Sequence, residues 1–235
     1  MKRSVLFWLL LVAALCVIEA KVYVVSVGIS DYPGTRNDLR VSANDAKTIV
    51  DIYQKNGNAQ VCLLTNEQAT RANVVEQVKR LFANATAADQ VLVYFSGHGT
   101  PGALVCYDSL LPYKQIVEKL MACSASGKIV IADACFAGRM RSSNKRGEKY
   151  DSQDVMFFLS SRSSETSRET GFSNSMFTIF LERGLRGGAD ADKNRIITAR
   201  ELYDFVHQGV IEATNGQQHP VMWGNFRDDM EIIKW

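Results

Sequence analysis

Two kinds of hydrophobic pattern alternate along the chain. Short β-branched apolar runs, typical of buried strands, occupy residues 22–30, 59–65, 91–95, 128–133 and 155–161. Apolar residues at helical spacing predict helices over residues 43–56, 71–83, 112–122 and 173–186, and a long amphipathic helix after residue 197. A short hairpin arm is expected at residues 102–108, and the final MEIIKW offers a last strand.

This alternation fixes the expected fold class. Strands that are apolar on both faces and separated by helices indicate a mostly parallel sheet with helices on both faces. We therefore predict a doubly wound α/β domain with three layers. No linker or internal repeat divides residues 21–235, so one domain is expected there.

Composition agrees with a globular domain. The chain has 235 residues, of which 46% are hydrophobic and 22% charged, and its net charge is +2. This is enough apolar material for a real core, and it gives no electrostatic case for nucleic acid as a partner.

Two segments fall outside this pattern. Residues 1–20 combine a positive start with an apolar stretch and a weak cleavage site, which predicts a signal peptide and a secreted or periplasmic protein. The alternative is an uncleaved membrane anchor. Residues 138–154 are polar, basic and rich in Gly and Ser, which predicts an exposed loop.

A histidine and a cysteine follow two of the predicted strands at the same relative point. VLVYF runs into Ser-Gly-His98-Gly, and KIVIAD runs into Ala-Cys135. Functional groups of open α/β sheets gather beyond the carboxyl ends of strands. There a thiol beside an imidazole can act as a nucleophile, and the imidazole can protonate a leaving amine. The backbone N–H groups of Gly99 and Cys135 are candidate donors to an oxyanion. The alternatives are a structural histidine and a small buried cysteine.

The segments YFSGHG (94–99) and DACFAG (133–138) resemble the His-Gly and Asp-x-Cys blocks of caspase-like cysteine peptidases, with metacaspases and their bacterial relatives the closest group. LRVSANDA (39–46) and the Ser-rich region with its following helix resemble further blocks of that group. The resemblance implies a caspase-like three-layer sandwich, a cysteine-type endopeptidase (a thiol protease), and protein or peptide substrates with basic residues.

The same resemblance implies roles for single residues. His98 is the expected general acid and base, and Cys135 the expected nucleophile that forms an acyl-enzyme. An acidic pocket that selects Arg or Lys before the scissile bond is expected from Asp45 and Asp133, with Ser96 and Ser42 also lining it. For Asp45, the alternative is an ordinary exposed acid near a helix N-terminus. The chain departs from metacaspases after Cys135, where Phe-Ala-Gly stands in place of the usual His-Ser-Gly.

The basic loop suggests how such an enzyme is activated. Candidate processing residues of a zymogen lie in it, in reach of an enzyme that prefers basic residues: Arg139, Arg141, Lys145, Arg146 and Lys149. The alternative is a loop that is basic only for solubility.

No cofactor is required by this chemistry, but calcium has one weak candidate site. Asp190, Asp192, Asn194 and Glu201 have the spacing of an EF-hand loop. Arg195 stands where that loop needs glycine, which disfavours the turn. A second role is open to the same segment, since Thr198 and Glu201 form a capping box pattern. A zinc site is not expected from three scattered histidines.

Three functions remain open on the sequence alone. The first is an exported peptidase that cleaves after Arg or Lys. The second is a peptidase of the same clan with another specificity, such as the asparagine preference of legumain-like enzymes. The third is a non-catalytic binding module with the caspase fold. The disulfide state of Cys62, Cys106 and Cys123 and the oligomeric state also stay open.

Overall fold

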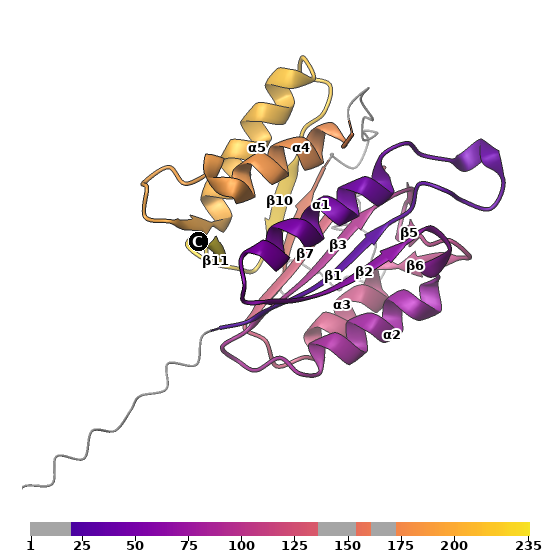
Figure 1. Ribbon diagram of the computed structural model, residues 1–235, viewed down its shortest axis with the longest axis horizontal. Coiled ribbons are helices and arrows are strands. Elements are labelled where there is room, and N and C mark those ends of the chain that lie inside the picture. Colours follow the sequence, from indigo (N-terminus) through magenta and orange to yellow (C-terminus); the bar gives the residue numbers. More distant parts are fainter. Residues whose placement is uncertain (1–19, 136–153, 161–172) are drawn as a thin grey trace, which may run out of the picture.

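The computed structural model describes residues 20–135, 154–160 and 173–235 (Figure 1). The predicted signal peptide therefore lies outside the described residues, except for its last position, and so do nearly all of the basic loop and all five candidate processing residues. Within the described ranges, no helix is both long enough and apolar enough to cross a membrane.

A six-stranded sheet forms the centre of the molecule, with strand order β10-β8-β7-β3-β1-β2. Five strands run parallel, and β10 at the edge is antiparallel to β8. The strands are β1 (Val22–Gly28), β2 (Ala59–Thr65), β3 (Gln90–Ser96), β7 (Gly127–Asp133), β8 (Met156–Leu159) and β10 (Val221–Gly224). The predicted α/β class with a mostly parallel sheet is confirmed.

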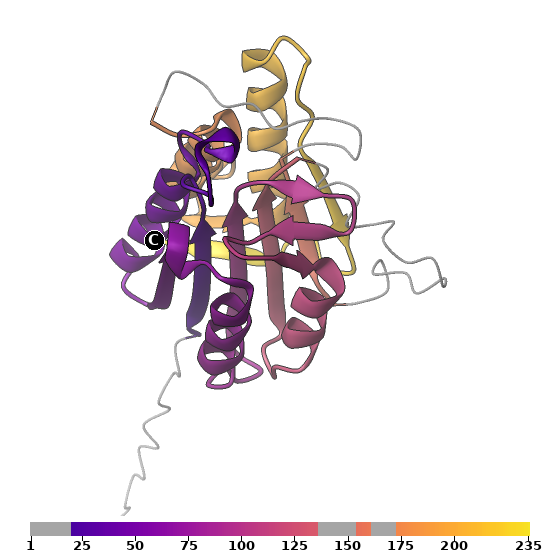
Figure 2. The same cartoon turned by 90° about the vertical axis from the view of Figure 1, so that its right-hand side faces the viewer.

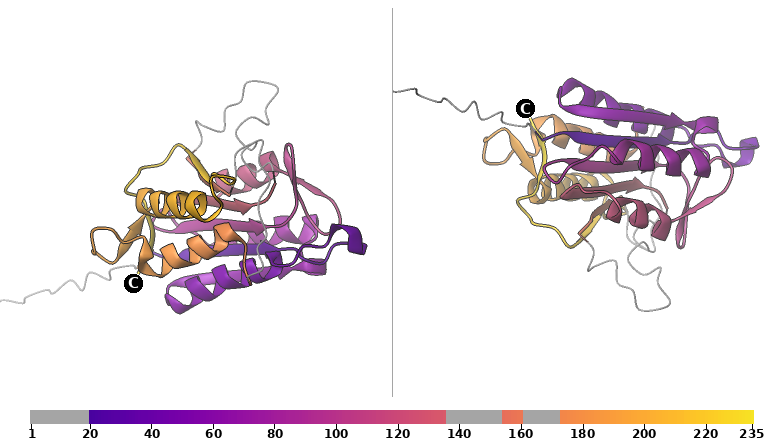
Figure 3. Two further views of the ribbon diagram at one scale, coloured as in Figure 1. Left: turned by 90° about the horizontal axis from the view of Figure 1, so that it is seen from above. Right: turned by 90° about the horizontal axis from the view of Figure 1, so that it is seen from below.

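Helices cover both faces of this sheet, as the views from above and below show (Figure 3). One face carries α2 (Arg71–Phe82) and α3 (Tyr113–Met121), and the other carries α1 (Ser42–Lys55), α4 (Met176–Arg183) and α5 (Ala199–Ala213). Neighbouring residues of a strand point to opposite faces, so Val24 belongs to one apolar core and Val25 to the other. This explains why the central strands are apolar throughout.

Short elements complete the chain. They are the 3-10 turns Thr35–Asn37 and Asn66–Gln68, the π-helical turn Gly184–Gly188, and the strands β4 (Gly99–Thr100), β5 (Ala103–Val105), β6 (Leu110–Pro112), β9 (Ile196–Thr198) and β11 (Glu231–Lys234). The expected hairpin arm is present as β5, which pairs with β4 and β6 in a small antiparallel sheet. Figure 2 shows this small sheet beyond the carboxyl ends of the central strands.

The C-terminal region contributes the expected last strand and one more strand that the sequence did not predict. The final segment does form a strand, β11, but this strand pairs with β9 in a separate two-stranded sheet. The edge of the main sheet is instead β10, which the sequence did not predict. Its four residues, Val-Met-Trp-Gly, are all only partly buried, as is typical of an edge strand.

Candidate functional site

His98 and Cys135 lie at equivalent positions beyond two adjacent strands. Ser96 at the end of β3 is paired in register with Asp133 at the end of β7. Each of the two candidate residues follows two positions later, and both line one cavity of about 80 Å³. The structure therefore brings together the pair that the strand-end pattern singled out.

The imidazole of His98 is held by the loop between β1 and α1. Its Nε2 lies 2.8 Å from the backbone carbonyl oxygen of Asn37. Because a carbonyl only accepts hydrogen bonds, this contact assigns a proton to Nε2. In the neutral ring Nδ1 is then the basic nitrogen, which is the form that a general base requires. The sequence could not reveal this partner, since a backbone carbonyl carries no residue-type signal.

Gly99 and Cys135 approach each other closely. A Cβ atom on Gly99 would lie 2.2 Å from the carbonyl oxygen of Cys135, so only glycine fits there. In the antiparallel β4–β5 pair, hydrogen-bonded and non-bonded positions alternate. Val105 N donates to His98 O, which makes His98 the bonded position and directs the N–H of Gly99 away from β5. This arrangement is compatible with the expected oxyanion role of Gly99.

Asp45 and Asp133 line the same cavity. Their exposed fractions are 0% and 4%, so Asp45 is not the exposed helix-start acid considered above. Asp45 accepts hydrogen bonds from Ser96 Oγ at 2.9 Å and from Ser175 N at 3.0 Å. Ser175 Oγ also donates to Asp133, so one serine bridges the two carboxylates.

Burial of this acidic pair perturbs its titration. Loss of solvent, followed by repulsion from Asp133, raises the pKa of Asp45 to about 7, although hydrogen bonds from Ser175, Ser96 and Asn174 oppose the rise. Two like charges placed together in a buried cavity are costly for the folded protein. A cation in the cavity would offset that cost.

Local sequence explains how Asp45 reaches this position. A Cβ atom on Gly28 would lie 2.2 Å from the carbonyl oxygen of Ser42, so glycine at the end of β1 allows α1 to begin directly against the sheet. Ser42 itself is buried and lines the same cavity. Ser175 was missed by the sequence reasoning. It is the N-cap of α4, where its side chain accepts from Thr178 N, and a serine before a helix carries no further signal.

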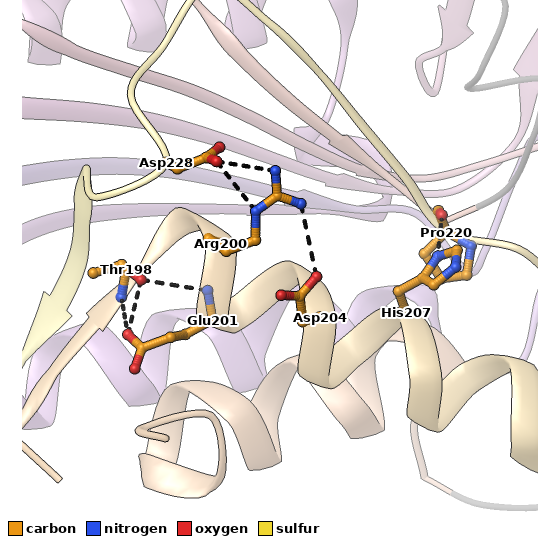
Figure 4. A network of polar contacts seen from close by, with 7 residues as sticks. All are labelled: Thr198, Arg200, Glu201, Asp204, His207, Pro220 and Asp228. Carbon is orange, nitrogen blue, oxygen red and sulfur yellow. Dashed lines mark hydrogen bonds and ion pairs between the residues drawn. The ribbon is translucent and has the colours of Figure 1, made fainter. Parts of the chain in front are cut away.

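The acidic segment forms a second, separate cluster. Carboxylate oxygens of Asp190, Asp192 and Glu201 lie within 4.8 Å of one another. The predicted capping box is present, since Thr198 and Glu201 exchange hydrogen bonds at the start of α5 (Figure 4). Arg195 adopts the left-handed conformation, with φ of 67°, so the turn is present although arginine disfavours it.

Hydrogen bonds within this loop account for its shape. Asp190 accepts from the backbone N–H groups of Asn194 and Arg195, which holds the left-handed turn. Glu201 accepts from Ala191 N and Thr198 N, and despite partial burial these bonds lower the pKa of Glu201. The donor set is one that calcium accepts, but the loop is already satisfied by its own N–H groups.

The described cysteines other than Cys135 do not take part in the site. Cys62, Cys106 and Cys123 are free thiols, as is Cys135. Burial raises the pKa of the Cys106 thiol to about 12, which makes it unreactive.

A three-layer α/β sandwich with histidine and cysteine at the carboxyl edge of its sheet has the architecture of a caspase-like protein. The family model described as the caspase domain matches residues 21–231, and the chain belongs to this family. It thus carries a domain of a cysteine peptidase family.

Solved structures agree on the fold. The crystal structure of protein GSU0716 from Geobacter sulfurreducens superposes with a TM-score of 0.69 at 16% identity, covering 92% of this chain and 97% of that chain. Caspase-1 from Spodoptera frugiperda superposes with a TM-score of 0.65 at 17% identity, covering 87% of this chain and 86% of that chain. No curated protein sequence was found to match the chain.

Proposed function

We propose that the protein is a cysteine endopeptidase of metacaspase type that cleaves after Arg or Lys. One observation carries this proposal: a histidine, a cysteine and two buried carboxylates line the same small cavity. His98 and Cys135 supply the reacting groups, and Asp45 and Asp133 supply a negative charge that a basic side chain neutralises.

The proposed reaction uses the histidine twice. The thiolate of Cys135 attacks the carbonyl carbon of the scissile bond, and the N–H groups of Gly99 and Cys135 stabilise the oxyanion. The imidazolium of His98 then gives a proton to the leaving amine as the C–N bond breaks, which leaves a thioester on Cys135. Water attacks this acyl-enzyme while His98 takes up one of its protons. The C–S bond then breaks, which releases the carboxylic acid and restores the Cys135 thiolate beside the imidazolium.

The position of the acidic pair supports the basic specificity. Asp133 lies two residues before the nucleophile, and Ser96 two residues before the histidine, so the pocket and the reacting groups share the same strand ends. A basic side chain held by Asp45 and Asp133 would place the following carbonyl beside Cys135. The preference for asparagine of legumain-like enzymes lacks this rationale, because a neutral amide would leave both carboxylates uncompensated.

The test is cleavage of matched fluorogenic peptides that end in Arg, Lys, Asp or Asn, with and without calcium. Turnover restricted to Arg and Lys, and absent in Cys135→Ala, is the expected result. Cleavage after Asn would retain the nucleophile and reject the pocket assignment. A protein that folds but neither cleaves nor reacts with a cysteine-directed acyloxymethyl ketone would be a binding module.

Export and self-processing belong to the same proposal. The apolar N-terminal segment supports export, and the basic residues between Arg139 and Lys149 match the proposed specificity. Mass spectrometry of the secreted wild-type protein and of Cys135→Ala would show both events. An N-terminus at Lys21 is expected in both proteins, and a cut within the basic loop only in the wild type.

A further inference from the structure

The hydroxyl of Tyr32 occupies an unusual place beside the catalytic histidine. The residue is 5% exposed and comes from the loop after β1, far in sequence from His98. Its oxygen accepts a hydrogen bond from the backbone N–H of His98 at 2.9 Å and donates one to the carbonyl oxygen of Val105 at 3.1 Å. The tyrosine therefore bridges two strands through their main chains.

The register of the small sheet shows what this bridge replaces. Gly99 pairs with Leu104, and the next pair in the same antiparallel register is His98 with Val105. An ordinary bonded pair exchanges two N–H to O=C bonds. One of these bonds is present, since Val105 N donates to His98 O at 2.9 Å. The other would join His98 N to Val105 O, but the Tyr32 hydroxyl lies between these two groups and bonds both of them.

His98 is also where the chain changes sheets. Gly97 N still donates to Asp133 O, which continues the β3–β7 pairing of the central sheet. One residue after His98, the chain is part of the β4–β5 pair. The Tyr32 hydroxyl thus keeps the His98–Val105 pair apart at the point where the chain passes from one sheet to the other. His98 is also the residue whose side chain lines the cavity.

Other contacts fix the hydroxyl and the ring in place. A Cβ atom on Gly97 would lie 2.7 Å from the Tyr32 oxygen, so the turn is shaped around this atom. The rings of Tyr32 and His98 have centroids 4.9 Å apart. Burial raises the pKa of Tyr32 well above its usual value, so the hydroxyl keeps the proton that it donates to Val105.

We propose that Tyr32 is a positioning residue for His98, whose hydroxyl wedges the His98–Val105 pair open and thereby sets the imidazole against Cys135. This inference rests on the proposed function of the dyad. Without the hydroxyl, the N–H of His98 and the carbonyl of Val105 would close to a direct bond. The backbone at His98 would then move toward β5 and carry the imidazole with it.

Tyr32→Phe removes the wedge and keeps the ring. Since misplacement of a reacting group by about 1 Å costs roughly 100-fold in rate, we expect kcat for an Arg peptide to fall at least about tenfold. The inhibition constant of the peptide acid product ending in Arg should stay within about twofold, because Asp45 and Asp133 are untouched. Titration of active sites with an arginyl acyloxymethyl ketone gives kcat per folded molecule.

Tyr113→Phe is the matched control. Tyr113 is buried as well, and its hydroxyl donates to Thr100 O at 3.0 Å in the same small sheet, whereas the hydroxyl of Tyr32 bonds His98 N. Its kcat should remain within about twofold of the wild-type value. A Tyr32→Phe variant with wild-type kcat, or an equal loss in Tyr113→Phe, would overturn the positioning role.

A third variant separates this inference from the proposed function. If His98→Ala retains full turnover, the dyad itself is wrong. If His98→Ala is inactive while Tyr32→Phe is fully active, the dyad stands and only the role of Tyr32 fails.

Discussion

The protein contains two clusters of acidic side chains, one buried in the cavity and one partly exposed at the start of α5. In the cavity, Asp45 and Asp133 come from α1 and β7, are almost fully buried and repel each other. At the start of α5, Asp190 and Asp192 of the preceding loop and Glu201 of the helix are close in sequence and at least partly exposed. The first cluster requires the whole fold to assemble, whereas the second is a local turn.

This difference distinguishes the proposed substrate pocket from a structural turn. The loop carboxylates accept backbone N–H groups of their own turn and stabilise it. The cavity carboxylates take hydrogen bonds from other elements, such as those of Ser96 and Ser175, and they carry a desolvation cost that a cationic ligand would offset. Substitutions in the cavity should therefore change activity more than stability, and substitutions in the loop should do the reverse.

The largest effect is expected for His98, which lines the same cavity as Asp45 and Asp133. Loss of a positioned general acid and base should lower kcat/KM for an Arg peptide by about 100-fold to 10,000-fold in His98→Ala. Steady-state kinetics on the folded variant measure this. His207→Gln is the control, since His207 lies in α5, bonds Pro220 O (Figure 4) and does not line the cavity. Equal losses in the two variants would reject a specific role for His98.

The next effect tests the cavity pair itself. Asp45→Asn keeps the shape and can still bond Ser96 and Ser175, but it removes one negative charge. Since the loss of a buried charge partner costs several kcal/mol, we expect kcat/KM for Arg peptides to fall by about 100-fold. The melting temperature at pH 8 should be equal or higher, because the buried repulsion is relieved.

Asp51→Asn on the same helix provides the comparison for that experiment. Asp51 is exposed, and its substitution should leave both activity and melting temperature unchanged. An Asp45→Asn variant that melts earlier but cleaves Arg peptides normally would make Asp45 a structural residue like those of the loop.

A smaller effect is expected in the pH dependence of specificity and of stability, and its direction follows from the raised pKa of Asp45. Asp45 gains its charge as the pH rises through about 7. The ratio of kcat/KM for Arg peptides to that for peptides with citrulline, its neutral analogue, should therefore increase over this range. An aspartate in the unfolded chain has a pKa of about 3.9. The unfolded chain thus loses this proton first, and the contribution of Asp45 to stability should fall between about pH 4 and pH 7.

Parallel measurements on Asp45→Asn isolate this contribution. The pH-dependent rise of the ratio and the stability loss should both be weaker in the variant. A ratio that does not depend on pH in the wild-type protein would show that Asp45 does not set the charge of the pocket.

The smallest effect is expected in the loop. Glu201→Ala removes one half of the capping box of α5, which should lower the free energy of unfolding by about 0.5–1 kcal/mol. Chemical denaturation measures this, and kcat/KM should remain within about twofold. A large loss of activity in this variant would link the loop to the site.

The contrast also explains which features the sequence could predict. Strands such as Val22–Gly28 are apolar on both faces, so their burial and pairing follow from composition. The strand ends then place His98 and Cys135 together, because parallel strands share a carboxyl edge. Strand β10 was not predicted: its apolar run is only four residues long, and it is a half-buried edge strand that pairs with β8.

Contacts that depend on tertiary assembly could not be predicted from residue types. The carbonyl of Asn37 and the hydroxyl of Tyr32 reach His98 only once the loop after β1 has folded over the small sheet. Ser175 approaches Asp45 and Asp133 from the start of α4, more than 40 residues from either in sequence. A local pattern does not carry such information.

The most direct test of the central claim is the site of covalent labelling by two acyloxymethyl ketone probes. One carries arginine and the other citrulline, which has nearly the same shape but no charge. Mass spectrometry of the full-length protein should find the arginine probe on Cys135 and much slower labelling by the citrulline probe. Equal labelling by both probes, or an adduct on another cysteine, would contradict the account.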